Sequence, residues 1–273
     1  MFQPYAVYQA ELTWGKCFNA CRGDDLGRLT NTATQPKPIG RIFAVLEDLR
    51  ENRLIAALSR ADCAALLKSG QIVELRQGTI VCEAEDEAEH VYFPLSGAIS
   101  LLVVLDQGKA VETATVGREG VVSAMAAFGM QVSQVRAIVQ NQLVAFRISA
   151  ASFRKLTASH RAILEVCVKF NETLLVQART IAACNTYHTV QQRFCRWLLF
   201  TADRVAPNEM KFTQETVAEL VGARRTSVSD VASRLSAAGL ISYSRGNVKI
   251  NDADALAKMS CECYATLRRL APS

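Results

Sequence analysis

The chain has 273 residues, of which 50% are hydrophobic and 21% are charged. This length predicts two domains, and the composition excludes a disordered chain because it supplies enough apolar residues to form cores. The longest apolar runs are too short to cross a membrane, and the first residues lack the basic-then-apolar order of a signal peptide. We therefore expect a cytoplasmic protein with no membrane partner.

The positive charge lies in the second part of the chain. Residues 1–159 carry 16 Lys or Arg and 16 Asp or Glu, whereas residues 160–273 carry 15 and 10, which accounts for the whole net charge of +5. Any polyanionic partner is therefore expected to meet the second part of the chain.

Short strands are predicted after an irregular N-terminal extension. Residues 1–40 hold turn-forming stretches and no sustained period, so they are expected to be irregular and partly disordered. Apolar segments bounded by turn residues then predict strands at 72–76, 79–81, 91–95, 98–105, 109–116, 135–139 and 143–148. Strands at this spacing are typical of a sandwich or barrel, and we assign residues 41–158 to this domain.

A long helix follows, because residues 162–183 contain neither Gly nor Pro and their apolar residues recur at helical spacing. The alternatives are a helix packed on its own domain and a coiled-coil dimer seam. We favour the seam, since about 22 residues span ~33 Å, more than one small domain needs. The dimerisation helix is assigned to residues 159–185, with a hinge at Asn185-Thr186 and a further helix at 190–203. The predicted seam residues are Ile163, Cys167, Phe170, Leu174, Gln177, Ile181 and Cys184.

Residues 213–250 fit a winged helix-turn-helix, within a last domain assigned to residues 186–273. With Gln214 as the first position, Ala218 falls where the second helix crosses the first, and Gly222 falls at the turn. Thr213 is the expected N-cap of the first helix. A strand, a tight turn at 244–247 and a returning strand then form the wing. Four valines fill the expected core between the helices: Val217, Val221, Val228 and Val231.

Such a unit places its second helix in the major groove of DNA. Arginine pairs with guanine edges, and Ser and Thr reach phosphates or bases. The alternative is a helical pair that contacts only protein, and we favour DNA because the helical pattern, the paired arginines and the wing occur together. The predicted DNA-binding residues are Thr213, Arg224, Arg225, Thr226, Ser227, Ser229, Asp230 and, on the wing, Arg245.

The order of these segments resembles the Crp/Fnr family of bacterial transcription regulators over about residues 41–250. The segments that carry the likeness are RQGTIVCEAEDEAEHVY, VYFPLSGAISLL with Gly97 at the turn glycine, and FTQETVAELVGARRTSVSDVASRLSAAGLI. The resemblance implies an α+β fold with an antiparallel, jelly-roll-like β-roll sensor domain, a dimerisation helix and a winged helix-turn-helix. It also implies a homodimer that binds a two-fold symmetric DNA operator, activates or represses transcription, and has RNA polymerase as a partner.

The residues that bind cyclic AMP in this family are not retained. Family members hold the ribose and cyclic phosphate with Gly-Glu and Arg-Ser pairs, and the base with a Thr-Ser pair. The corresponding positions here are Ser123 and Ala124, Arg136 in a shifted register, and Ala178 and Arg179. These residues form the candidate effector pocket, and we expect no tight binding of cyclic AMP because its polar groups would be left unpaired.

No metal or other cofactor is predicted. The nine cysteines are scattered and odd in number, which favours reduced, buried thiols. Iron–sulfur members of the family use three closely spaced N-terminal cysteines, whereas this chain has Cys17 and Cys21 alone there. Haem is not expected either, because His90 is the only histidine in the predicted β domain. Cys261 and Cys263 resemble half of a metal site, but no second pair follows, so they are assigned to a helix core.

The favoured function is that of a DNA-binding regulator. The alternative is a signal-binding module, of the cyclic-nucleotide or redox type, that controls a partner protein. An enzyme is not expected, since the sequence shows no catalytic triad, metal-ligand spacing or phosphate-binding glycine loop.

Overall fold

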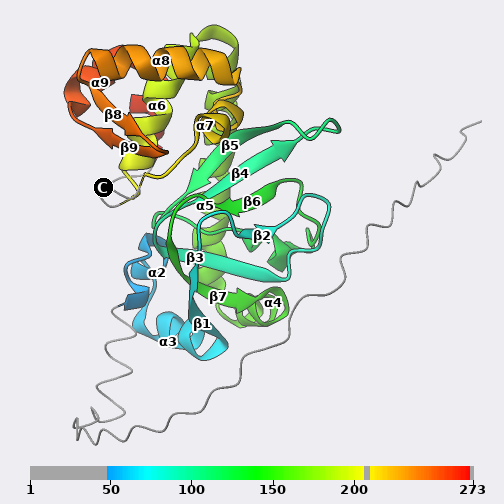
Figure 1. The fold of residues 1–273 in the computed structure, drawn as a ribbon. Coiled ribbons are helices and arrows are strands. Elements are labelled where there is room, and N and C mark those ends of the chain that lie inside the picture. The colour runs from blue at the N-terminus through cyan, green and yellow to red at the C-terminus, as the bar shows by residue number, and fades with distance from the viewer. Residues whose placement is uncertain (1–47, 206–209, 271–273) are drawn as a thin grey trace, which may run out of the picture. The chain divides into compact units, whose positions relative to one another are not determined.

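The structure, a computed structural model, describes residues 48–205 and 210–270. These residues form a β domain, a long helix and a C-terminal helical domain with a small hairpin, which confirms the predicted α+β architecture (Figure 1). The predicted extension over residues 1–40, with Cys17 and Cys21, lies outside the described residues, and so does the start of the predicted β domain at residue 41.

The β domain contains two antiparallel sheets. One sheet has the order β1 (Gly70–Leu75), β7 (Leu143–Ser149), β3 (His90–Ser96); the other has the order β2 (Ile80–Cys82), β6 (Arg136–Val139), β4 (Ile99–Val104), β5 (Ala110–Val116). All seven strands were predicted from apolar segments and turn residues. At the turn before β4, Gly97 has φ +75°, and a Cβ there would lie 2.3 Å from the carbonyl oxygen of Gln142. Only glycine fits this turn.

Helices that the sequence did not predict close one end of the β domain. These are α2 (Arg53–Ala56), α3 (Arg60–Ser69) and the 3₁₀ helix η1 (Ala124–Phe128), beside the predicted α4 (Ala150–Ser159). The fully buried Asn52 caps α2 by accepting from the backbone N–H groups of Leu54 and Ile55. Its amide donates to the carbonyl oxygens of Pro94 (3.0 Å) and Gly120 (2.8 Å). One side chain thus ties α2 to the strands.

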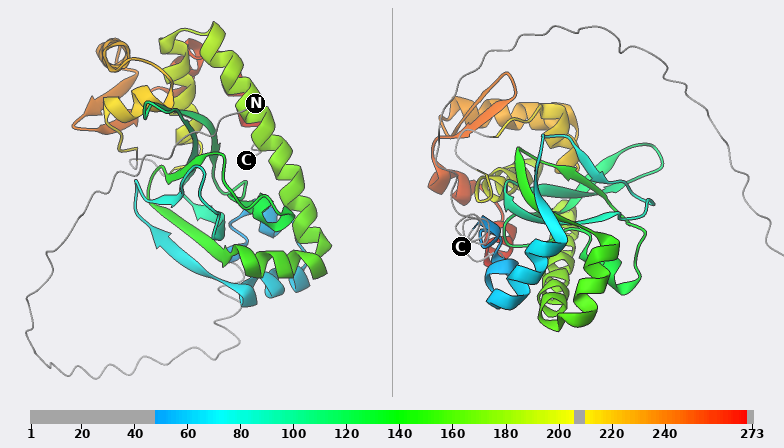
Figure 2. Two further views of the ribbon diagram at one scale, coloured as in Figure 1. Left: turned by 90° about the vertical axis from the view of Figure 1, so that its right-hand side faces the viewer. Right: turned by 90° about the horizontal axis from the view of Figure 1, so that it is seen from below.

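Helix α5 (Arg161–Tyr187) packs along the β domain, as the left view of Figure 2 shows. The side chains on the inner face of this helix pack into the hydrophobic cores of the same chain. The ring of Phe170 rests on Gly120, where an added Cβ would lie 2.1 Å from the ring, and Gln177 accepts a bond from the backbone N–H of Thr115 (3.1 Å). Among the described residues, no helix is long and apolar enough to cross a membrane, α5 included.

The residues predicted for the dimer seam are therefore wrong, because their side chains pack inside their own chain. Heptad spacing shows that a helix face is covered, but it does not show by which partner, and here the chain itself covers that face. The side chains of the predicted seam are buried inside the chain, apart from Leu174, which is partly buried against the same core; they are Ile163, Cys167, Phe170, Gln177, Ile181 and Cys184.

The C-terminal domain is a winged helix-turn-helix with two added helices. Its elements are α6 (Val190–Ala202), α7 (Gln214–Leu220), α8 (Arg225–Ala237), β8 (Ile241–Ser244), β9 (Asn247–Ile250), α9 (Ala253–Met259) and α10 (Cys263–Leu270). Helix α6 starts with a capping box between Thr189 and Gln192, and its buried Trp197 packs edge-on against Phe212, with 4.9 Å between ring centroids. This core carries the helix pair α7 and α8.

Candidate nucleic-acid interface

The α7–α8 pair forms as the residue pattern predicts. The hydroxyl of Thr213 caps α7 by accepting from the backbone N–H of Thr216 (3.1 Å). Gly222 lies in the turn with φ +62°, a conformation that glycine adopts without strain. Ala218 is buried where the helices meet, and the four predicted core valines, Val217, Val221, Val228 and Val231, are buried as well.

A buried arginine fixes this turn to the preceding helices. Arg193 of α6 donates through Nη1 to the carbonyl oxygens of Val221 (3.1 Å) and Gly222 (3.3 Å), and more weakly to Asn185 of α5 (3.4 Å). A cation at the C-terminal end of α7 also stabilises the helix dipole. The end of α5 and the turn before α8 thus share one side chain.

Most predicted DNA-binding residues lie at the surface. Arg224 is the N-cap residue of α8, and its side chain makes no capping bond. Ser227 and Ser229 are half-buried, and the hydroxyl of Ser229 donates to Gln214 Oε1 (2.7 Å), so Ser229 also has a role in holding α7 to α8. The exposed members are Thr213, Arg224, Arg225, Thr226, Asp230 and Arg245.

The wing and the start of α8 enclose a hollow of about 520 Å³. It is lined by Thr213, Glu215, Arg225 and Arg245, among others. At the wing tip, Arg245 has φ +49° and Gly246 φ +81°, the two positive values of a tight hairpin turn. Nε of Arg225 lies 3.6 Å from a carboxylate oxygen of the exposed Glu215, a contact that water screens. Two guanidinium groups are therefore available beside this hollow.

The predicted effector residues have separate partners. Ser123 is the N-cap of η1 with φ +63°, and the neighbouring Ala124 is buried. Arg136 of β6 pairs with Glu83 (Nε to Oε1, 2.7 Å), and this bond lowers the pKa of the Glu83 carboxyl. Arg179 is exposed on α5 and lies 3.7 Å from Glu172, while Ala178 beside it is half-buried.

A second hollow, of about 570 Å³, opens on the β domain. Acidic side chains line much of it: Glu83, Asp86, Glu87 and Glu89. His90 also lines it, and its Nδ1 lies 4.0 Å from Glu89. The guanidinium of Arg147 lines it too, but the carboxylates outnumber it, and a surface of this net charge disfavours a phosphate group.

The β domain also contacts α6 through charged groups. Arg204, after α6, pairs with Glu119 of the β domain, and both side chains are almost fully buried. Nearby on β5, the buried carboxylate of Glu112 accepts from Ser100 Oγ (2.7 Å) and Gln140 Nε2 (3.3 Å). Burial raises the pKa of Glu112, and the hydrogen bond from Ser100 and the charge of Arg196 on α6 oppose this shift.

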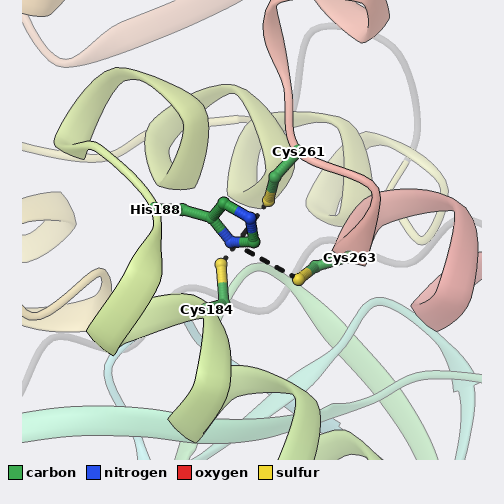
Figure 3. Close-up of side chains that lie close together, drawn as sticks. All are labelled: Cys184, His188, Cys261 and Cys263. Atoms are coloured by element: carbon green, nitrogen blue, oxygen red, sulfur yellow. Dashed lines mark hydrogen bonds between the residues drawn. The ribbon is translucent and has the colours of Figure 1, made fainter.

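One cluster of side chains was not predicted from the sequence. Cys184, His188, Cys261 and Cys263 come together where α5 ends and α10 begins, with all four ligand atoms within 4.8 Å of one another (Figure 3). The second pair of ligands, Cys184 and His188, lies about 75 residues before Cys261 and Cys263 and not after them. The signal in the sequence is the four-residue spacing between Cys184, in the last turn of α5, and His188, the residue that follows this helix.

Comparisons with known proteins agree with this architecture. Residues 72–160 match the cyclic nucleotide-binding domain, and residues 192–259 match the Crp-like helix-turn-helix domain. Together the two matches cover more than half of the chain. No curated protein gives a significant match.

Several solved structures share the fold. A putative Crp/Fnr-family transcriptional regulator from Eubacterium rectale is 18% identical with a TM-score of 0.61, covering 81% of this chain and 99% of that chain. The c-di-GMP-responsive global regulator CLP from Xanthomonas campestris is 19% identical with a TM-score of 0.58, covering 70% and 99%. A Crp-family regulator from Thermus thermophilus is 20% identical with a TM-score of 0.58, also covering 70% and 99%.

The two domain matches occur in the order in which the structure shows a β domain, a long helix and a winged helix-turn-helix. The chain therefore belongs to the Crp/Fnr family of transcription regulators.

Proposed function

We propose that the protein is a homodimeric, sequence-specific DNA-binding regulator that recognises a two-fold symmetric operator. The observation that carries this proposal is the pair of exposed guanidinium groups, Arg225 at the start of α8 and Arg245 on the wing, which line one hollow. Arg225 would read a base edge in the major groove, and Arg245 would contact a phosphate. RNA polymerase is the proposed protein partner, in keeping with the family.

The homodimer would form through the outer face of α5. Val168 and Leu175 are 47% and 41% exposed, although both are large and apolar. They lie seven residues apart, Ala182 continues this heptad line, and Leu164 lies one turn before Val168 on the same side of the helix. Leu164 and Val168 also line an apolar hollow of about 590 Å³ with Phe128 of η1. Covering this stripe with a second copy of α5 would remove it from water.

The proposed regulator does not depend on cyclic AMP. Arg136 is neutralised by Glu83, and in the neighbouring hollow four carboxylates outnumber the single guanidinium of Arg147, so a cyclic phosphate would meet net repulsion. A titration calorimetry experiment with cyclic AMP tests this point. Binding in the micromolar range would contradict it.

The experiment that tests the proposed function is selection of sequences from a random duplex DNA library by the full-length protein. Recovered sites should contain two inverted half-sites about one helical turn apart. Fluorescence anisotropy on the selected site at two salt concentrations should give a steep salt dependence and a large preference over a scrambled duplex. If equal affinity for selected and scrambled DNA were found, a module that controls a partner protein would be the better description.

A further inference from the structure

We propose that Cys184, His188, Cys261 and Cys263 form a binding site for one Zn²⁺ ion. Cys184 lies in the last turn of α5, and His188 directly follows that helix. Cys261 lies in the link between α9 and α10, and Cys263 is the first residue of α10. Three thiols and one imidazole are a ligand set that tetrahedral zinc sites use. The proposal is independent of DNA binding.

Two of the ligand distances fit a single tetrahedral ion, and all four ligand atoms lie within 4.8 Å of one another. The sulfur atoms of Cys184 and Cys261 are 3.5 Å apart, and Cys263 Sγ lies 3.7 Å from His188 Nδ1. Zn–S bonds of about 2.3 Å at tetrahedral angles separate two ligand sulfurs by about 3.8 Å. A disulfide requires sulfurs about 2.05 Å apart, so the Cys184–Cys261 contact is not one. The spacing therefore matches ligands that share one ion.

The imidazole is oriented as in known metal sites. Its Nδ1 faces the thiols, as Figure 3 shows, and its Nε2 lies 3.2 Å from the carboxylate of Glu262. A carboxylate that holds the second nitrogen of a metal-bound histidine fixes the ring and increases its basicity. Glu262 itself is 79% exposed, which leaves it free to serve as this outer ligand.

The surroundings also suit a closed, structural site. The three cysteines are at most 7% exposed and pack together as a small separate cluster. Three thiolates and one Zn²⁺ leave a net charge of −1. Arg196 of α6 is 1% exposed and lies within electrostatic reach of Cys184, and its Nε and Nη1 have no hydrogen-bond partner in the described part of the chain. This buried cation, which also acts on the carboxylate of Glu112, favours negative charge on the thiols.

A metal at this position would join the end of α5 to the start of α10. The chain between them contains the whole helix-turn-helix and its wing. The ion would therefore link the last helix of the C-terminal domain to the junction between α5 and α6, near Thr189. Metal binding energy of this kind adds directly to the stability of the folded state.

The first test uses the full-length chain, purified under reducing conditions and stripped with a chelator. Titration with Co²⁺ should give one ion per chain, with sulfur-to-cobalt charge-transfer bands and intense tetrahedral d–d bands, and Zn²⁺ should displace it. X-ray absorption at the zinc edge should then show three sulfur ligands at about 2.3 Å and one nitrogen at about 2.0 Å. Absence of thiolate charge-transfer bands would overturn the proposal.

Variants locate the site. C184A and the double variant C261A/C263A should lose the stoichiometric cobalt spectrum, while C82A and C167A, which remove buried cysteines outside the cluster, should keep it. Glu262→Ala should weaken cobalt affinity about 10- to 100-fold without changing the band positions, since it holds the histidine and not the ion. A cobalt spectrum that survives in C261A/C263A would contradict the assignment. The absorption data on the unaltered chain settle the ligand set even if a variant fails to fold.

Discussion

Arg204 and Glu119 join the two domains through a buried ion pair. Both Nε and Nη2 of Arg204 lie 2.8 Å from Oε1 of Glu119, and the two side chains are only 4% and 8% exposed. The backbone N–H of Gly117 donates to the same oxygen (3.2 Å), and the guanidinium also stacks on the ring of Phe200, 3.6 Å from its centroid. The loop after β5 is thereby attached to the end of α6.

Removing the carboxylate of Glu119 should lower the stability of the folded chain. Because Glu119→Ala leaves the buried Arg204 without its partner, we expect the free energy of unfolding to fall by about 3–5 kcal/mol. Urea denaturation measures this change. Glu51→Ala is the matched control, because Glu51 pairs with Arg118 at 2.9 Å on the surface and its loss should cost at most about 1 kcal/mol. Equal effects of the two variants would show that the buried pair does not hold the domains together.

The raised pKa of the buried Glu112 predicts that the stability of the folded chain depends on pH. Burial raises the pKa of its carboxyl in the folded chain, so the folded state keeps a proton that the unfolded chain loses above about pH 4.5. Stability should therefore fall as pH rises from 4.5 toward the folded pKa. Glu112→Gln removes this loss, and its gain in melting temperature should be larger at pH 8 than at pH 4.5. The exposed Glu74→Gln is the control, and a gain that does not change with pH would argue against this account.

Leu174 and Leu175 face different surroundings, so variants at these adjacent positions distinguish an effect on folding from an effect on dimerisation. Leu174 packs on the core of the β domain, whereas Leu175 is 41% exposed on the outer face of α5. Leu175→Glu should give a folded monomer in analytical ultracentrifugation, because the charge would face the proposed partner helix. Leu174→Glu should instead lower the melting temperature, because it places a charge against the core. A dimer that tolerates Leu175→Glu would mean that another surface forms the interface.

Arg225 is expected to read DNA. Arg225→Ala should weaken binding to the selected site by ~1–3 kcal/mol, or about 5- to 150-fold, and relax the preference at one base position. Anisotropy titrations and a repeated selection measure both effects. Arg76→Ala removes the same charge from an exposed position of the β domain and should leave affinity nearly unchanged. Equal losses in the two variants would indicate a general charge effect in place of base reading.

The features that could be predicted from the sequence are those set by residues close together in the chain. Alternating apolar residues located the strands, and the small residue Ala218, the turn glycine Gly222 and the spaced valines located the helix-turn-helix. These signals are local because each demand, such as a positive φ at Gly222, acts within a few residues. Helix α2 is held by Asn52, which bonds to distant backbone groups, and α2 and α3 bury Ile55 and Leu66 in the core of the β domain, contacts that depend on the complete fold.

Properties that depend on distant partners were predicted poorly. The two heptad lines, one through Cys167 and one through Phe170, were real, but they pack on the β domain of the same chain, which periodicity cannot specify. Cys184 was placed on the line through Phe170 and lies instead against Cys261. Contacts between residues so far apart in sequence depend on the complete fold, and a search limited to neighbouring residues does not find them.

The contact between Cys184 and Cys261 can form only late in the synthesis of the chain. Because 77 residues separate the two cysteines, a ribosome releases α5 and the whole helix-turn-helix before Cys261 emerges. The cysteine cluster is therefore completed only after the DNA-binding helices have been synthesised. A chain truncated before α9 would carry every predicted DNA-contacting residue and still lack α10 together with Cys261 and Cys263, which are half of the cluster.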